Sequence, residues 1–287
     1  MKHLKKVIES IKSNHAETSE ALQAQIWELI CYAPKMPVRF QQQGLLDIAT
    51  KVELQVYDQY FSKTDLKFNT FKWGNGAKLI VLTHGWGSKA ADFAELITAL
   101  IKIDDVTVVA FDAPGNGSSD GHLSNLFLFV EAIKQIADYY GPATVMIGHS
   151  LGAKASVRAI QQGGAVPNLL ITIAPLINLK ENFKGSMTAV GVSAADQQTF
   201  LDSFEKLYGQ SIDDFHLQKM YGFAGQTKHV LLYELNDTIT PSSDIADFLQ
   251  QYPDVTSIQY SHTTHAKIIS DPLAIAEIVA LVHSETR

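Results

Sequence analysis

Residues 143–152 read ATVMIGHSLG, an apolar run that ends in Gly148-His149-Ser150-Leu151-Gly152. The apolar run predicts a buried strand, and residues 153–160 (AKASVRAI) predict a helix directly behind the pentapeptide. A serine on so tight a strand-to-helix turn has a strained backbone that presents its hydroxyl at the strand's carboxyl end, while the flanking glycines relieve crowding. Ser150 is therefore a candidate nucleophile, and the alternative is a glycine-rich turn that only links strand and helix.

A serine nucleophile needs a histidine to take its proton and a carboxylate to orient that histidine. In hydrolases with this turn the acid and then the base follow the serine, on loops after later strands. Asp237 follows the predicted strand 229–235 and is our candidate acid. Its alternative role is to cap the next helix. Glu234 is the competing acid, but its position inside the strand makes it less able to reach a histidine on the next loop.

Two histidines follow the next predicted strand, residues 255–260. We favour His265 as the base because it lies well beyond the strand, just before a helix that we expect to begin near Ala266. His262 is the competing base, and its alternative position is at the end of the strand. The alternative for both is a solvated loop or an opportunistic metal pair, although two histidines alone make a poor zinc site.

The reaction also needs two donors for the oxygen that becomes negative in the tetrahedral intermediate. The turn supplies the first, the backbone amide of Leu151. The predicted strand 78–83 runs into His84-Gly85-Trp86-Gly87, and we assign the second donor to the Trp86 amide. The flanking glycines allow the backbone to turn that amide toward Ser150, and the His84 ring can brace the loop. Trp86 could also be only a core aromatic in a tight turn.

Residues 111–120 (FDAPGNGSSD) complete a set of motifs that resembles the α/β-hydrolase superfamily from about Lys67 to the end of the chain. In that family the Asp-x-Pro-Gly-x-Gly-x-Ser turn is structural, so the resemblance implies a supporting role for Asp112 and no place in the triad. Asn116 stands where many members carry histidine. The resemblance implies that the reaction requires neither a metal nor an organic cofactor.

Alternating apolar segments and helical patterns predict an α/β fold, with a mainly parallel central sheet, helices on both faces and a helical cap. Residues 51–58 and 67–74 alternate like an antiparallel pair. We divide the chain into an N-terminal helical segment with an edge strand, a hydrolase core in two pieces, and a cap inserted between them. These parts are residues 1–66, residues 67–176 with 228–287, and residues 177–227.

The cap segment is much longer than a crossover requires and carries many aromatic residues. Ser193 and Ser211 each precede acidic residues in patterns that predict helix starts. Most of the aromatics should form the cap's own core, but some should face the substrate. Our expected substrate-binding residues are Trp86, His149, Phe204, Tyr208 and Tyr221.

The composition excludes several function classes. The net charge of −7 offers no basic surface for nucleic acid. Cys31 is the only cysteine, so neither an intrachain disulfide nor a multi-cysteine metal site can form. No stretch approaches the roughly 20 apolar residues of a membrane span, and we expect a soluble cytoplasmic protein without an integral membrane segment. The amphipathic first 30 residues predict a helical pair docked on the body, with a homodimer face or a membrane-surface helix as alternatives.

These observations predict a serine hydrolase, first of all a carboxylesterase acting on a small to medium apolar ester. A thioesterase, a carbon-carbon bond hydrolase and an acyltransferase use the same triad and remain open. A ligand-binding protein on a hydrolase scaffold is the alternative outside the enzymes.

Overall fold

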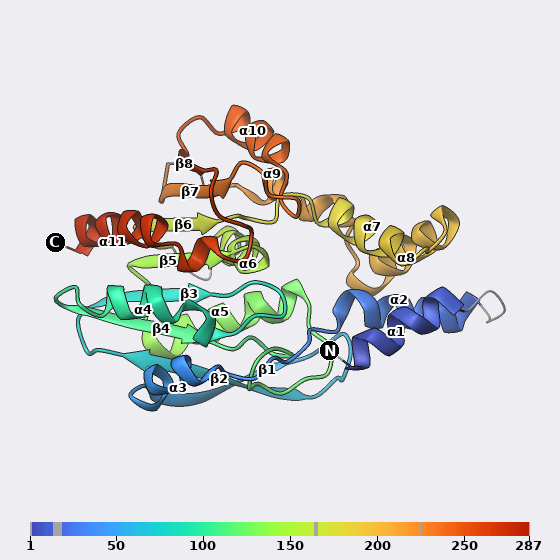
Figure 1. Ribbon diagram of the computed structural model, residues 1–287, viewed down its shortest axis with the longest axis horizontal. Coiled ribbons are helices and arrows are strands. Elements are labelled where there is room, and N and C mark those ends of the chain that lie inside the picture. The colour runs from blue at the N-terminus through green and yellow to red at the C-terminus, as the bar shows by residue number, and fades with distance from the viewer. Residues whose placement is uncertain (1, 14–18, 164–165, 224, 287) are drawn as a thin grey trace.

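The computed structural model describes residues 2–13, 19–163, 166–223 and 225–286, and within them eight strands form one sheet (Figure 1). The strand order is β1-β2-β4-β3-β5-β6-β7-β8. The strands are β1 (Thr50–Tyr57), β2 (Asp65–Trp73), β3 (Lys78–Thr83), β4 (Val106–Phe111), β5 (Val145–His149), β6 (Leu169–Ile173), β7 (Lys228–Glu234) and β8 (Thr256–Tyr260).

Strands β3 to β8 pair in parallel, whereas β1 pairs antiparallel with β2 and β2 antiparallel with β4. The predicted mainly parallel sheet with an antiparallel pair at its start is confirmed. Every residue of β5 and β6 is buried, as expected for central strands that helices cover on both faces. The carboxyl ends of the parallel strands lie along one edge, where the loops that carry the candidate site residues meet.

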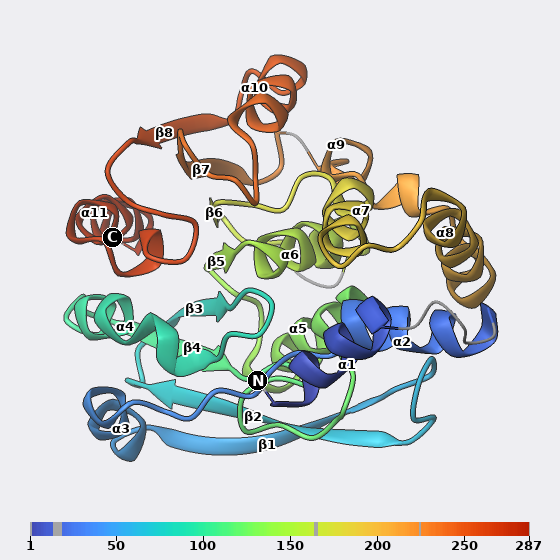
Figure 2. The same cartoon turned by 45° about the vertical axis from the view of Figure 1, so that its right-hand side comes forward.

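Helices pack on both faces of the sheet (Figure 2). One hydrophobic core lies under α5, α6 and α10, and the other lies under α4 and α11. The bounds of these helices are α4 (Ala94–Leu100), α5 (Leu126–Tyr140), α6 (Leu151–Gln161), α10 (Ser242–Gln251) and α11 (Pro272–Thr286), with α3 (Phe40–Asp47) before β1.

The helix after the candidate base begins later than the sequence suggested. A short 3-10 turn, η3 (Ile268–Ser270), follows the loop, and α11 starts only at Pro272 rather than near Ala266. The Asp271 side chain accepts hydrogen bonds from the amides of Leu273 and Ala274, and proline suits the first helical position. The hydrogen bonds of Asp271, six residues beyond His265, therefore determine where the helix starts.

Two pairs of helices lie beside each other at one end of the molecule (Figure 1). Between β6 and β7 the chain forms α7 (Leu179–Ala189), α8 (Ala194–Tyr208), the 3-10 turn η2 (Ile212–Phe215) and α9 (Leu217–Met220). Helices α1 (Lys2–Ser13) and α2 (Ser19–Cys31) dock there, and α2 contacts both α7 and α8. Ser193 caps α8 as predicted, but Ser211 starts only the short turn η2.

Buried apolar residues explain why the N-terminal helices dock. Val7, Ile11, Ile26 and Ile30 are at most 8% exposed and belong to the same core cluster as the apolar residues of α7 and α8. The predicted docking of a helical pair on the body is therefore what the structure shows. No helix of the described residues is both long and apolar enough to cross a lipid bilayer.

Candidate active site

Ser150 occupies a strained turn between β5 and α6, with φ 52° and ψ −117°. A Cβ on Gly148 would lie 2.5 Å from the Ala153 Cα, and one on Gly152 would lie 2.3 Å from the carbonyl oxygens of Thr83 and His84. Both positions therefore exclude any larger residue. The glycines allow the turn to fold tightly and keep α6 close to the end of β3.

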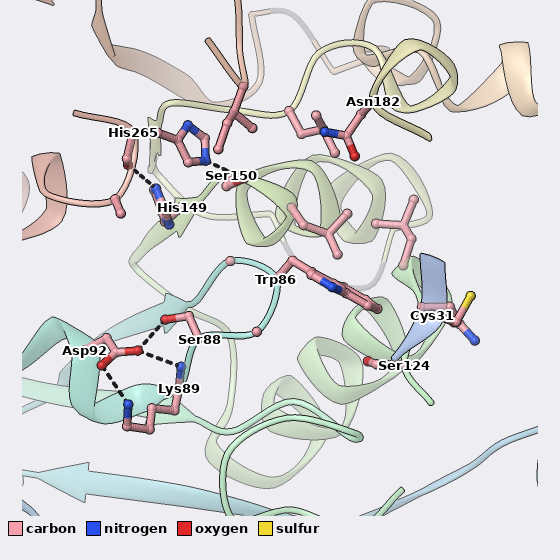
Figure 3. Close-up of a pocket in the computed structure, with 18 of the residues that line it drawn as sticks. Cys31, Trp86, Ser88, Lys89, Asp92, Ser124, His149, Ser150, Asn182 and His265 are labelled. Atoms are coloured by element: carbon pink, nitrogen blue, oxygen red, sulfur yellow. Dashed lines mark hydrogen bonds and ion pairs between the residues drawn. The ribbon is translucent and has the colours of Figure 1, made fainter. Parts of the chain in front are cut away.

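The loops after β7 and β8 bring Asp237 and His265 to this turn. His265 Nε2 lies 3.0 Å from Ser150 Oγ (Figure 3). On its other side, His265 Nδ1 lies 2.6 Å from Asp237 Oδ2. The Asp237 carboxylate accepts a hydrogen bond from the Nδ1–H of His265. The Nε2 lone pair is then free to take the proton of Ser150. The three residues proposed from the sequence therefore form one continuous hydrogen-bonded chain.

Asp237 is held as an anion by its surroundings. Burial alone would raise its pKa, but hydrogen bonding and charge attraction from His265 outweigh burial, so the pKa lies below its usual value. The Asp237 Oδ1 atom also accepts hydrogen bonds from the amides of Ile239 at 2.8 Å and Thr240 at 3.1 Å. The loop backbone thus orients the carboxylate toward the imidazole.

The two competing residues have other partners. Glu234 is 2% exposed, and its carboxylate accepts hydrogen bonds from the amides of Asn236 at 3.2 Å and Thr263 at 3.1 Å. It thereby ties the loop of Asp237 to the loop of His265 without contacting the imidazole. His262 pairs with Asp271 at 3.0 Å.

The loop after β3 lies directly against the turn that carries Ser150. A Cβ on Gly85 would meet His149 Nδ1 at 2.9 Å and Ser150 Cβ at 3.2 Å, so only glycine fits there without displacement. The His84 ring accepts a hydrogen bond from the Ala113 amide and donates to the Gly85 carbonyl, as its predicted bracing role requires. The backbone amides of Trp86 and Leu151 have no hydrogen-bond partner among the described residues.

The Asp-x-Pro-Gly turn supports this loop from the other side. Asp112 accepts hydrogen bonds from the amides of Ala90 and Ser118, and Asn116 Oδ1 accepts one from the Gly87 amide at 3.1 Å. Asp112 contacts no member of the Ser150 chain. Its supporting role, implied by the resemblance, agrees with these contacts.

His149 lines the pocket, but its ring also holds the loop of the candidate base. Its Nε2 donates to the His265 carbonyl oxygen at 2.8 Å. Burial, together with the nearby His265, lowers the pKa of His149 to about 3, so the ring is neutral at physiological pH. A neutral ring can donate this hydrogen bond without adding charge beside His265.

Ser150 and His265 open into a cavity of about 1020 Å³. Trp86, Phe204 and Tyr208 line it, as expected for substrate-binding residues. Tyr221 does not: its hydroxyl lies 3.1 Å from His229 Nδ1, and its ring packs against neighbouring aromatic residues. The chain turns back toward β7 after α9, which places Tyr221 against α10 rather than over Ser150. The expected substrate contact of Tyr221 is therefore wrong for this arrangement.

Several lining residues were not identified from the sequence. Helix α2 contributes Leu29, Ile30 and Cys31, and α7 contributes Asn182 and Phe183. Figure 3 shows Cys31 at the side of the pocket away from His265. The amphipathic pattern of α2 was visible in the sequence, but it does not tell which pocket the apolar face covers.

Comparisons with known proteins agree with this architecture. The model of the alpha/beta hydrolase family matches residues 80–278. An esterase/lipase of Mycoplasma genitalium is 20% identical over 219 residues, which are 64% of this chain and 80% of that protein. Two solved structures share the fold. An esterase of Pyrococcus furiosus has a TM-score of 0.59 and 17% identity, covering 89% of this chain and 97% of that chain. A monoacylglycerol lipase of Paleococcus ferrophilus has a TM-score of 0.59 and 20% identity, covering 76% and 99%.

The identities to the solved structures are low, so that likeness concerns the fold. The family match spans well over half of the chain and includes Ser150, Asp237 and His265 with the loops that carry them. Together with the sheet order and the strained serine, it leads to one conclusion: this chain belongs to the alpha/beta hydrolase family.

Proposed function

We propose that the protein is a serine carboxylesterase that hydrolyses esters of apolar acyl groups through an acyl-enzyme. The observation that carries the proposal is the chain of hydrogen bonds from Ser150 through His265 to Asp237, at 3.0 and 2.6 Å, at the wall of a large cavity. This geometry suits a nucleophile, a general base and an orienting carboxylate in that order.

In the first half of the reaction Ser150 Oγ attacks the ester carbonyl carbon while His265 Nε2 takes the serine proton. The carbonyl oxygen becomes negative in the tetrahedral intermediate. The Trp86 and Leu151 amides, which have no partner among the described residues, are our proposed donors to that oxygen. The intermediate then collapses, the bond to the alcohol oxygen breaks, and His265 returns the proton to the leaving alcohol.

In the second half water attacks the acyl carbon and His265 takes a proton from that water. The second tetrahedral intermediate expels Ser150 Oγ, which recovers its proton from His265, and the carboxylic acid leaves. Asp237 stays ionised throughout and stabilises the imidazolium that forms in each half. Glu234 and His149 hold the loop of His265 in place through their hydrogen bonds to Thr263 and to the His265 carbonyl.

The cavity lining supports an apolar acyl group. Most lining contributed by α2, α7 and α8 is aliphatic or aromatic. The charged lining residues Arg39, Lys89, Asp92, Glu95 and Lys267 come from other segments, and Lys89 is paired with Asp92 at 2.9 Å (Figure 3). Ligand pockets commonly measure about 300–1,000 Å³. A cavity of about 1020 Å³ has room for more than an acetyl group. We therefore place the preferred acyl chain at medium rather than minimal length.

A fluorophosphonate probe tests the nucleophile directly. The wild-type protein should be labelled covalently, Ser150→Ala should not be labelled, and His265→Ala should be labelled much more slowly. Intact-mass and peptide analysis would locate the adduct. Absence of labelling in a correctly folded wild-type protein would contradict the proposal and would favour a ligand-binding protein.

A substrate panel then tests the reaction class. p-Nitrophenyl esters of rising acyl length, assayed beside acyl-CoA thioesters, should give the highest kcat/KM with an ester of medium chain length. A clear preference for the thioesters would replace the esterase assignment with a thioesterase while leaving the triad intact.

A further inference from the structure

Two histidines and one glutamate from distant parts of the chain meet on the surface. His3 lies in α1, Glu28 in α2, and His122 in the loop between β4 and α5. His3 Nε2 lies 2.9 Å from one oxygen of the Glu28 carboxylate, and His122 Nε2 lies 3.0 and 3.1 Å from its two oxygens. None of the three residues lines the cavity above Ser150.

We propose that His3, Glu28 and His122 bind a divalent transition-metal ion of the Zn²⁺ type. One ligand atom from each residue lies within 4.8 Å of the others. In a tetrahedral zinc site with bonds of about 2.0–2.2 Å, neighbouring ligand atoms are about 3.3 Å apart. Small side-chain adjustments therefore make room for an ion at the centre of the group, and water completes its coordination.

The chemistry of the ligands selects the ion. Two imidazoles and one carboxylate suit zinc and similar transition metals, whereas Mg²⁺ and Ca²⁺ prefer oxygen ligands only. The two Nε2 atoms now face the same carboxylate, which requires at least one of them to carry a proton toward it. Binding of the metal would place the protons on the Nδ1 atoms, so that both Nε2 lone pairs face the ion.

The surroundings hold the three side chains together while leaving a path for the ion. The Tyr32 ring contacts both imidazoles, with ring centroids 4.6 Å from His3 and 5.2 Å from His122. The side chains of His3, Glu28 and His122 are 43%, 29% and 57% exposed. An ion can therefore enter from solvent without opening the fold.

The position of the site suggests what the ion does. Glu28 directly precedes Leu29, which lines the cavity, and the Ser124 amide near His122 donates to the Cys31 carbonyl at 2.8 Å. A bound ion would join α1, α2 and the loop before α5 at the base of the N-terminal helix pair. It would thus be a structural ion that fixes one wall of the cavity, without touching the reacting atoms.

Titration calorimetry on tag-free protein with Zn²⁺ tests the proposal, because it does not depend on any enzymatic activity. We expect binding at one ion per chain, and no comparable binding of Mg²⁺. Changes in outer-shell partners already cost about 10- to 100-fold in metal affinity. His3→Ala and His122→Ala each remove a direct ligand, so each should weaken Zn²⁺ binding by at least that factor.

His262→Ala is the matched control. This histidine is 47% exposed and pairs with the carboxylate of Asp271, but among the described residues it belongs to no group of three potential metal ligands. Its loss should leave Zn²⁺ affinity unchanged. As a second readout, Zn²⁺ should slow proteolysis of the N-terminal helices in the wild type and in His262→Ala, but not in His122→Ala. Absence of Zn²⁺ binding, or equal affinity in His122→Ala and wild type, would refute the site.

Discussion

Lys154 offers a quantitative test of how the cap is anchored. Its side chain on α6 is fully buried, and Nζ donates hydrogen bonds to the carbonyl oxygens of Ile177 at 3.0 Å and Phe215 at 2.5 Å. These carbonyls lie just before α7 and at the end of η2. Lys154, which lies one turn of α6 beyond Ser150, therefore joins α6 to the start of the segment between β6 and β7 and to the end of η2 within it.

Burial lowers the pKa of Lys154 from 10.5 to about 7, because the charged ammonium has lost its water. Between these two values the unfolded chain binds more protons at this residue than the folded protein, so the free energy of unfolding rises with pH. Above pH 7 the free energy of unfolding rises by about 1.36 kcal/mol for each pH unit, because only the unfolded chain keeps the proton. From pH 6 to pH 9 the total increase is about 3 kcal/mol. The contribution is smallest below pH 7, where both states are protonated.

Replacing Lys154 with glutamine or methionine should remove this pH dependence. Glutamine can still donate to one of the carbonyls, whereas methionine leaves both without a donor, at a cost of about 1–3 kcal/mol each. Urea unfolding at several pH values between 6 and 9 gives the free energy of unfolding for each protein. The difference between wild type and either variant should move by about 3 kcal/mol in favour of the wild type over this range.

Comparison with the variants cancels contributions from groups that do not interact with Lys154; His216 is the exception, because burial and the charge of Lys154 both lower its pKa. Burial lowers the pKa of His149 and of His229 to about 3, which is below the range, and burial raises the pKa of the Cys31 thiol above its usual value in wild type and variants alike. The reasoning would be refuted if the free energy of unfolding changed with pH in the same way in the wild type, Lys154→Gln and Lys154→Met. They would mean that the buried amine does not change its charge between pH 6 and 9.

Three substitutions address the active site. Asp237→Asn should lower kcat by about 10⁴-fold while the melting temperature changes little, because the amide favours the wrong tautomer of His265; steady-state kinetics and calorimetry check both, and full activity would end the acid assignment. Gly85→Ala places a Cβ 2.9 Å from the His149 ring and should displace the Trp86 loop, lowering kcat by about 10²- to 10³-fold as after loss of one oxyanion donor; an unchanged kcat would argue against that donor. Leu29→Trp should fill the part of the cavity formed by α2 and shift the chain-length optimum toward shorter esters; the same optimum as wild type would show that acyl chains do not reach α2.

Much of the framework follows from local sequence patterns. The apolar runs at 78–83 and 229–235 could be predicted as buried strands, and the predicted boundaries differ from the observed strands by no more than about two residues. The nucleophile turn was recognisable because a serine at φ 52° between two crowded glycines leaves a short, local signature. Asp237 and His265 could be proposed because each follows a strand in the order that the chemistry requires.

The walls of the pocket depended on contacts between residues far apart in the chain. Periodicity identifies an apolar helix face but not the surface that it meets, which is why Tyr221 was placed in the cavity and Leu29 was not. The sequence favoured Asp237 over Glu234 because Asp237 follows the strand, but only the structure shows that the loop backbone directs the Asp237 carboxylate to the imidazole while Glu234 binds the Thr263 amide.

The chain by itself therefore determined the order of strands and helices and the chemistry available at the strand ends, since these depend on residues close together in sequence. Only the tertiary structure decided which helices enclose the cavity, how Lys154 is buried, and that His3, Glu28 and His122 meet. Those features arise when segments more than 20 residues apart pack together, and packing of that kind leaves no periodic trace in the sequence.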